Sequence, residues 1–472
     1  MHRATSALLA LACAVGGCAA DEGRQELGWD DDLRMPLADD LDDDEHVLEV
    51  ELVATEAELQ IRPGPPTKLY TYNGTLPGPM LRLREGDRLV VHFRNELPEP
   101  TSIHWHGIRL DNAMDGAPPH TQEPVMPGES FDYDFVVPDA GTYWYHPHVR
   151  SAAQVGFGMY GALIVDPKTG PENPALVGDE VVLILSDMTL DDDNELADAD
   201  TGGELGTLFG REGEVLLANG KRSAWLNAKR GLRQRWRVIN ASRSRYFQLD
   251  LGGAEFTQIG GDAGPLADHL TTKSPVVVPG GRADLVVVPT GVAHQSVPLL
   301  WVPFDRGFGS TEFRSPVNVF RLALSETEAR EAMPLTAPRA TVEPLSPEGA
   351  TPVEIDLTQQ KNADGALTLG INGVPFDEAP PISASVGETQ LWTVRTKMQF
   401  SHPFHLHGFF FQPLGPDGMP TGEWRDTMDV PHTDGELRFL VRYDNRPGMW
   451  MFHCHILDHA DAGMMGMVDL RN

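Results

Sequence analysis

A pattern that recurs three times along the 472 residues limits the possible folds of this chain more than any other feature. An Asn-Gly pair follows an apolar stretch at Asn73, Asn219 and Asn372, at intervals of 146 and 153 residues. In each copy a glycine then opens a strand-like run that is rich in β-branched and aromatic residues and bounded by turn signals. These runs are Arg88–Asn95, Arg233–Asn240 and Thr389–Arg395. Repetition at the length of a domain predicts three all-β sandwich domains rather than a solenoid, whose period is shorter.

The first and third copies also share pairs of histidines. His104-Trp-His-Gly matches His405-Leu-His-Gly, and the run Gly141–His148 matches Gly448–His455. Alternate residues of a strand share a face, so the two imidazoles of each His-x-His pair project together. Eight imidazoles are too many for one first-row ion and suit three ions where the first and third domains meet. The eight are His104, His106, His146, His148, His405, His407, His453 and His455. The middle copy has only His269 and His294, which predicts a spacer domain without metal ligands.

Cys454 lies between His453 and His455, so in a strand its thiolate faces one way and the two imidazoles face the other. A lone cysteine is usually a small buried hydrophobe, but further metal-binding side chains flank this one. A cysteine with two histidines and a weak axial methionine is the ligand set of a blue-copper site. Imidazoles alone suit copper, zinc, iron or nickel, and zinc would leave the methionine unexplained. The predicted copper set is His402, Cys454, His459 and Met464.

Four motifs stand in order along the chain: H-W-H-G, H-x-H, H-P-x-H-L-H-G and H-C-H-x3-H-x4-M. Over about residues 46–472 the chain therefore resembles the three-domain multicopper oxidases, which include laccases, bacterial copper-efflux oxidases and spore-coat laccase. The resemblance implies three cupredoxin-like Greek-key domains and four copper ions. By motif position, a type 1 copper takes His402, Cys454 and His459 with Met464 axial, and a type 2 copper takes His104 and His405. A type 3 pair takes His106, His146, His148, His407, His453 and His455.

The resemblance also implies a reaction in which four one-electron oxidations of a reducing substrate are coupled to the reduction of dioxygen to water. Electrons would enter at the edge of His459 and pass through Cys454. Asp115, in Met-Asp-Gly, matches a family acid that assists oxygen reduction, although an aspartate before a glycine is also common in turns. A second acid follows the position of His459 in many bacterial relatives. Here that residue is Ala460, and the neighbouring acids are Asp458 and Asp461.

The electron donor is less constrained than the copper sites. Copper-efflux relatives carry a methionine-rich insertion in the third domain, whereas only Met398 lies between Pro338 and His402 here. We therefore expect an open, laccase-like pocket that takes phenols and aromatic amines. The alternatives are a cuprous or other metal-ion oxidase that acts in copper tolerance, and a copper-binding or storage protein without enzymatic activity.

The N-terminal segment predicts the location of the protein, and its net charge limits the kinds of partner. Residues 1–18 have signal-peptide proportions, and Val15-Gly-Gly-Cys18 resembles a bacterial lipoprotein processing box; plain cleavage near Ala19 or Ala20 is the alternative. We expect an exported monomer, periplasmic or anchored to the cell envelope by a lipid on Cys18. A net charge of −32 argues against nucleic-acid binding. The predicted parts are a signal peptide at 1–18, an acidic disordered linker at 19–45, and domains at 46–167, 168–338 and 339–472.

Overall fold

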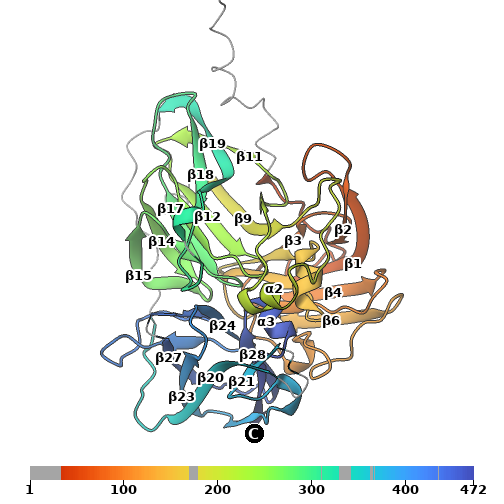
Figure 1. Cartoon of the computed structure of the whole chain (residues 1–472), viewed down its shortest axis with the longest axis vertical. Coiled ribbons are helices and arrows are strands. Elements are labelled where there is room, and N and C mark those ends of the chain that lie inside the picture. Colours follow the sequence, from red (N-terminus) through yellow and green to blue (C-terminus); the bar gives the residue numbers. More distant parts are fainter. Residues whose placement is uncertain are drawn as a thin grey trace, which may run out of the picture.

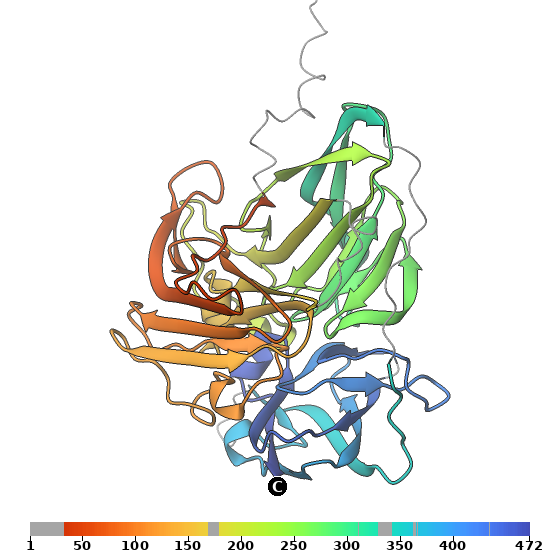
Figure 2. The same ribbon diagram turned by 180° about the vertical axis from the view of Figure 1, so that it is seen from behind.

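The computed structural model describes residues 33–168, 179–309, 311–328, 342–361, 365, 367–433 and 435–472. Its strands fall into three sandwiches in chain order, coloured red to orange, yellow to green, and blue (Figures 1 and 2). No helix within these residues is long and apolar enough to cross a bilayer. The predicted signal peptide and the lipid on Cys18 lie outside the described residues.

The first sandwich has two four-stranded sheets with the orders β2-β1-β4-β6 and β3-β8-β7-β5. Its strands are β1 Val47–Leu59, β2 Thr67–Tyr72, β3 Gly78–Arg84, β4 Arg88–Asn95, β5 His104–His106, β6 Ser130–Val136, β7 Gly141–His146 and β8 Gly161–Asp166. A 3₁₀ turn, η2 Asn112–Met114, and a short helix, α1 Ser151–Gly156, lie in its connections. Alternate side chains of β1 and β4 are buried, as expected for strands that turn one face to a core.

The second sandwich has a six-stranded sheet, β10-β9-β12-β17-β14-β15, and a five-stranded sheet, β11-β19-β18-β13-β16. Its strands are β9 Asp179–Met188, β10 Val215–Ala218, β11 Ala224–Arg230, β12 Gln234–Asn240, β13 Phe247–Asp250, β14 Phe256–Gly261, β15 Gly264–Thr272, β16 Val276–Val277, β17 Arg282–Val287, β18 Ser296–Val302 and β19 Val317–Glu328. The helix α2 Gly203–Phe209 lies between β9 and β10, and the 3₁₀ turn η3 Thr311–Phe313 precedes β19.

The third sandwich has two five-stranded sheets, β21-β20-β23-β27-β25 and β22-β29-β28-β24-β26. Its strands are β20 Thr351–Lys361, β21 Leu367–Ile371, β22 Ile382–Ser385, β23 Thr389–Thr396, β24 His402–Leu406, β25 Phe411–Pro413, β26 Thr427–Val430, β27 Glu436–Arg442, β28 Gly448–Cys454 and β29 Met465–Arg471. The 3₁₀ turn η4 Phe376–Glu378 and the helix α3 Leu457–Asp461 complete it.

The three sandwiches repeat one plan, which confirms the all-β prediction. A parallel pair opens each of them: β1 with β4, β9 with β12, and β20 with β23. Asn73, Asn219 and Asn372 all have positive φ, and the glycine after each does too, which is the geometry of a type I′ turn. Each asparagine side chain also accepts a backbone N–H from the first strand of its parallel pair. The repeat in the sequence is therefore a repeated turn with a fixed hydrogen-bonding role.

The end of the acidic segment is ordered, which differs from the disordered linker expected over residues 19–45. Leu33 is buried in the core of the second sandwich, and Met35 is buried in a cluster that joins the first two sandwiches. Leu37 forms a bridge with Met80. Apolar side chains placed between the acid runs therefore fix residues 33–38 to the body of the protein, while most of the carboxylates of residues 39–45 face solvent.

The sandwiches meet around two of the short helices. α2 of the second sandwich contacts α3 of the third, which also contacts α1 of the first. The helices α2 and α3 lie at the junction of the three sandwiches in Figure 1. One continuous hydrophobic cluster contains core residues of the first and third sandwiches, so these two domains are packed directly against each other.

Candidate metal centre

Strand pairing brings the histidine pairs of each domain together. In the first sandwich β5 pairs with β7 so that His104 lies opposite His146. In the third sandwich β24 pairs with β28 so that His405 lies opposite His453, one residue before Cys454. The same antiparallel contact therefore aligns two His-x-His motifs in each domain.

The eight predicted imidazoles converge where the first and third sandwiches meet. Rings of the two domains stack on each other, His104 on His407 and His106 on His405, with centroids 3.8 Å apart. The six predicted type 3 ligands can be divided into two sets of three, each of which contains histidines of both domains. In one set the ring centroids of His106, His146 and His455 are 5.0 to 5.7 Å apart. In the second set those of His148, His407 and His453 are 5.0 to 5.3 Å apart. The remaining pair, His104 and His405, has centroids 6.0 Å apart.

Backbone carbonyls fix the orientation of several of these rings. Nδ1 of His104 donates to the carbonyl of Asp115 at 2.8 Å, and Nδ1 of His405 donates to that of Asp426 at 2.9 Å. His146 is held in the same way by the carbonyl of Pro147. The Nε2 atom of each of these three imidazoles is buried and has no hydrogen-bond partner.

These unpartnered nitrogens test whether the site fits a metal. A buried polar atom without a partner is costly, and several on one cluster indicate that a cation completes their bonding. Both nitrogens of His455 and Nδ1 of His106 are also unpartnered. Potential ligand atoms of His104, His106 and His146 lie within 4.8 Å of one another, as do those of His148, His407 and His453. The donor set therefore fits bound metal ions.

The protonation state of the imidazoles suits metal binding. Burial lowers the pKa of His106, His146 and His407 well below the usual range, and neighbouring histidines lower it further. The same causes act on His453 and His455. A metal ligand must be a neutral imidazole, and these side chains are neutral at physiological pH without a change in conformation.

A second group of side chains surrounds Cys454, the only cysteine among the described residues. Its Sγ lies 3.5 Å from Nδ1 of His459 and accepts the backbone N–H of Ile456. The ring of His402 lies 5.1 Å from that of His459, and neither of its nitrogens has a partner. Met464 is buried beside this group, and its backbone bonds to those of Cys454 and His459. Burial raises the pKa of Cys454 to about 12, so a bound cation is needed to hold its thiolate.

His459, at whose edge we expect electrons to enter, is covered in the structure. None of this side chain is exposed to solvent, and its Nε2 donates to the carbonyl of Leu208 in α2 at 3.0 Å. This contact could not be predicted from the sequence, because Leu208 lies in another domain and belongs to no motif.

Asp115 is buried between two of the imidazoles. Its Oδ2 accepts from Nδ1 of His407 at 2.9 Å, while its backbone carbonyl holds His104. Burial acts to raise the pKa of Asp115, but His407 and His104 lower it more, so the group is a carboxylate. A side chain on the next residue, Gly116, would collide with the carbonyl of Ile103, so this turn must hold a glycine. Asp115 therefore both shapes a turn and positions an imidazole.

The two acids near Ala460 have different environments. Asp458 is buried in an ion pair with Arg211 and Arg243 of the second sandwich. Asp461 is exposed and accepts the backbone N–H groups of Ser151 and Ala152 at the start of α1. Both acids line a pocket that reaches His148. Among the described residues no arginine forms an ion pair with Asp461, so the structure separates two residues that the sequence left equivalent.

The second sandwich contributes to the site although it supplies no imidazole. Arg282 is fully buried and binds Asp426 of the third sandwich through both carboxylate oxygens. The hydroxyl of Thr427 donates to Asp426 at 2.8 Å and accepts from Nε2 of His106 at 3.1 Å. This chain of contacts leaves Nδ1 of His106 free for a metal. That the second domain holds no metal remains a prediction, but this domain is more than a spacer, because Arg282 supports the site from it.

Three family models described as "Multicopper oxidase" match residues 53–170, 179–295 and 346–472. The chain is 32% identical over 447 residues to a multicopper oxidase, MmcO, of Mycobacterium tuberculosis, covering 86% of this chain and 84% of that protein. It is 26% identical to a laccase of Bacillus subtilis, covering 86% and 91%. The structure is similar to a multicopper oxidase of Campylobacter jejuni described as a metallo-oxidase, with a TM-score of 0.78, 27% identity and coverage of 93% and 94%.

Proposed function

This chain belongs to the multicopper oxidases, and on that premise we propose that it oxidises phenols and aromatic amines at the Cys454 site while it reduces dioxygen at the histidine cluster. It is a laccase-like, copper-dependent oxidoreductase with three cupredoxin-like domains. The observation that supports the proposed sites is the convergence of eight imidazoles, seven of them on buried residues, beside a cysteine, with unpartnered nitrogens on most of the rings.

The proposed ligands follow the motif positions, and each set of three histidines combines residues of the first and third domains. His402, Cys454 and His459, with Met464, would hold the type 1 copper, and His104 and His405 the type 2 copper. The two sets of three histidines would each hold one copper of the type 3 pair. These sets are His106, His146 and His455, and His148, His407 and His453.

When bound, copper accepts one electron at a time from a donor and delivers electrons to dioxygen. The protein supplies the electron path, the orientation of the imidazoles and the access pocket. The strand β28 and the residue after it join the thiol of Cys454 to the imidazoles on either side through one backbone unit each, which is a short covalent path. Asp115 fixes Nδ1 of His407 and so determines which nitrogen of that ring faces the cluster. The pocket at His148 offers small molecules a route toward the cluster, with Asp461 on its wall.

The choice of donor rests on the relatives named laccase and on the lack of a methionine-rich insertion. A metal-ion oxidase is the second candidate, because a structural neighbour is described as a metallo-oxidase. We also propose that the protein is exported and that a lipid on Cys18 anchors it, on the basis of the N-terminal sequence alone.

Copper quantitation, a visible spectrum and oxygen uptake on one purified sample test the proposal. We expect about four coppers per chain, a strong blue band, and uptake of one dioxygen for every four phenol molecules oxidised. A copper-loaded sample that consumes no oxygen with any phenol or aromatic amine would contradict the proposed donor class. Faster turnover of Cu(I) than of phenols would favour the metal-ion oxidase instead.

A further inference from the structure

A segment of the second sandwich covers the donor side of the proposed type 1 site. Residues 191–210, here called the cap, leave the sheet after β9, include α2, and return before β10. The carbonyl of Leu208 in the cap accepts a hydrogen bond from Nε2 of His459 at 3.0 Å. Because Nδ1 of the same ring faces Cys454, neither nitrogen is available to an incoming donor.

Aromatic side chains extend the cover to the second proposed histidine ligand. Phe209 of the cap stacks on Phe308 with ring centroids 4.7 Å apart, and Phe308 meets Phe400 edge-on at 5.3 Å. Phe400 in turn stacks on His402 at 4.7 Å. A molecule of the size of a phenol therefore touches neither imidazole while the cap is in place.

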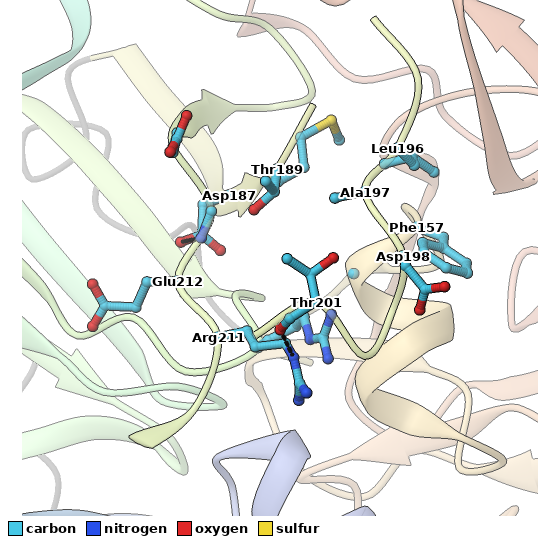
Figure 3. Close-up of a pocket in the computed structure, with 14 residues that line it drawn as sticks. Phe157, Asp187, Thr189, Leu196, Ala197, Asp198, Thr201, Arg211 and Glu212 are labelled. Atoms are coloured by element: carbon cyan, nitrogen blue, oxygen red, sulfur yellow. Dashed lines mark hydrogen bonds between the residues drawn. The ribbon is translucent and has the colours of Figure 1, made fainter. Parts of the chain in front are cut away.

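The cap is fastened at one end by a small number of polar contacts. Arg211, which follows the cap, pairs with the buried Asp458 of α3 through both its backbone N–H and its guanidinium group. The same guanidinium donates to the carbonyls of Thr201 and Gly203 in the cap, and Figure 3 shows Arg211 reaching Thr201. Arg243 also pairs with Asp458 and donates to the carbonyl of Ala199 in the cap, so two arginines tie the cap to the helix that contains His459.

Near the other end of the cap Asn194 is buried and donates to the carbonyls of Pro63 and Pro65, so the more open part of the cap lies between Asn194 and Arg211. A pocket opens between Leu196, Ala197 and Asp198 of the cap and the strand residues Asp187 and Met188 (Figure 3). Gly202, Gly203 and Gly210, at the two ends of α2, have positive φ, a conformation in which glycine rotates with little steric cost. The cap therefore has three features of a segment that can move: polar contacts, an open space behind it, and glycines at the ends of α2.

The outer face of the cap is strongly acidic. The cap contains seven carboxylates and no lysine or arginine, and all seven are exposed. They are Asp191, Asp192, Asp193, Glu195, Asp198, Asp200 and Glu204. A surface of one sign attracts ligands of opposite charge and repels those of the same charge, and salt weakens both effects.

We propose that the cap selects the electron donors of this enzyme, favouring small neutral or cationic aromatic molecules over bulky or anionic ones. The inference rests on the proposed function and names the donor class of that site. Each donor loses one electron to the type 1 site, and a phenol also releases its hydroxyl proton to water. Four such oxidations supply the four electrons that, with four protons, convert one dioxygen into two waters.

The steric part is tested by Phe209→Ala, which loosens the cap without touching a proposed ligand. Phe131→Ala is the matched control, because Phe131 is also a half-buried ring in an aromatic pair, with Tyr133 of the first sandwich. In Phe209→Ala we expect faster hydrogen exchange over residues 191–210 of the apoprotein. We also expect kcat/KM for a bulky phenol to rise roughly three- to tenfold, the range set by the loss of one aromatic contact, while that for a small phenol stays within about twofold. Phe131→Ala should change neither the hydrogen exchange of the cap nor the ratio of kcat/KM for the two phenols.

Arg211→Ala provides a second way to release the cap and should give the same pattern. If exchange over the cap rises while the ratio of the bulky to the small phenol is unchanged, the steric proposal is wrong. Unchanged exchange in both variants would also overturn it. Because exchange is measured without copper, these results are separable from a failure of the proposed function, in which no donor supports oxygen uptake.

The charge part is tested by Asp200→Asn combined with Glu204→Gln. The control pair, Asp43→Asn with Glu45→Gln, removes two exposed carboxylates far along the chain from the cap. We expect the cap variant to raise kcat/KM for a dianionic aromatic donor and to lower it for a cationic one, and salt should reduce both differences. Equal effects of the two pairs, or a preference of the unmodified enzyme for the dianion at low salt, would refute the selection by charge.

Discussion

Replacing Arg282 tests whether the second sandwich supports the metal centre. The guanidinium is fully buried and contacts all three domains, donating to Thr142 of the first, to Asp262 and Gly280 of the second, and to Asp426 of the third. Burial lowers the pKa of Arg282, but Asp426 and Asp262 raise it more, so the charge is retained. Arg282→Met leaves the carboxylate of Asp426 buried without its cation.

Removal of one partner from a buried ion pair costs about 3–5 kcal/mol. We therefore expect the free energy of unfolding of the apoprotein to fall by about that amount, measured by urea denaturation. The matched control is Arg109→Ala, because Arg109 also bridges two domains, through Asp139 and Asp444, but is half-exposed. Exposed pairs contribute about 0–1 kcal/mol, so the control should change stability little.

The same variant should also disturb copper binding in a specific way. Asp426 orders Thr427, which selects the tautomer of His106, so the histidine cluster should lose copper while the blue band of the Cys454 site persists. Arg282→Lys should recover part of the loss, because it restores the charge. The reasoning would be refuted if Arg282→Met cost no more than Arg109→Ala, or if it removed the blue band and the cluster copper equally.

Further predictions concern single side chains and the metal. Cys454→Ser should abolish the blue band and donor oxidation while circular dichroism stays unchanged, since the side chain is nearly the same size. Asp115→Ala should lower kcat by about 10²-fold and reduce copper content, as expected when a hydrogen bond to a metal ligand is lost. Asp115→Glu keeps a carboxylate and should lose less activity and less copper. Burial raises the folded-state pKa of Asp429 to about 6, so its contribution to stability is present at low pH and is lost as pH rises through 6. Asp429→Asn should remove that decrease in urea-unfolding experiments between pH 4 and 7, and a decrease of unchanged size would show that another group titrates. Removal of copper with a chelator should lower the melting temperature, because the ligands form a site only in the folded state, and equal values with and without copper would contradict this.

Much of the architecture followed from the sequence. The run Arg88–Asn95 is strand β4 as predicted, and the runs predicted in the other two domains coincide with β12 and β23 to within one residue. The histidine pairs could be placed because a strand has a period of two, so His-x-His always projects from one face. A repeat at domain length, turns with a required φ, and ligands spaced along strands are all local properties, which the order of residues determines directly.

The environment of the donor site depended on contacts between distant residues. Leu208 meets His459 across 251 positions of the chain, and Arg282 meets Asp426 across 144. Asp458 and Asp461 look alike in the sequence, yet two arginines of another domain neutralise only the first. The sequence alone predicted which residues bind copper. The packing of the three domains decided which of these residues and their neighbours are buried, which form ion pairs and which face a pocket. Burial and ion pairing depend on residues that are distant in the sequence, so local patterns cannot predict them.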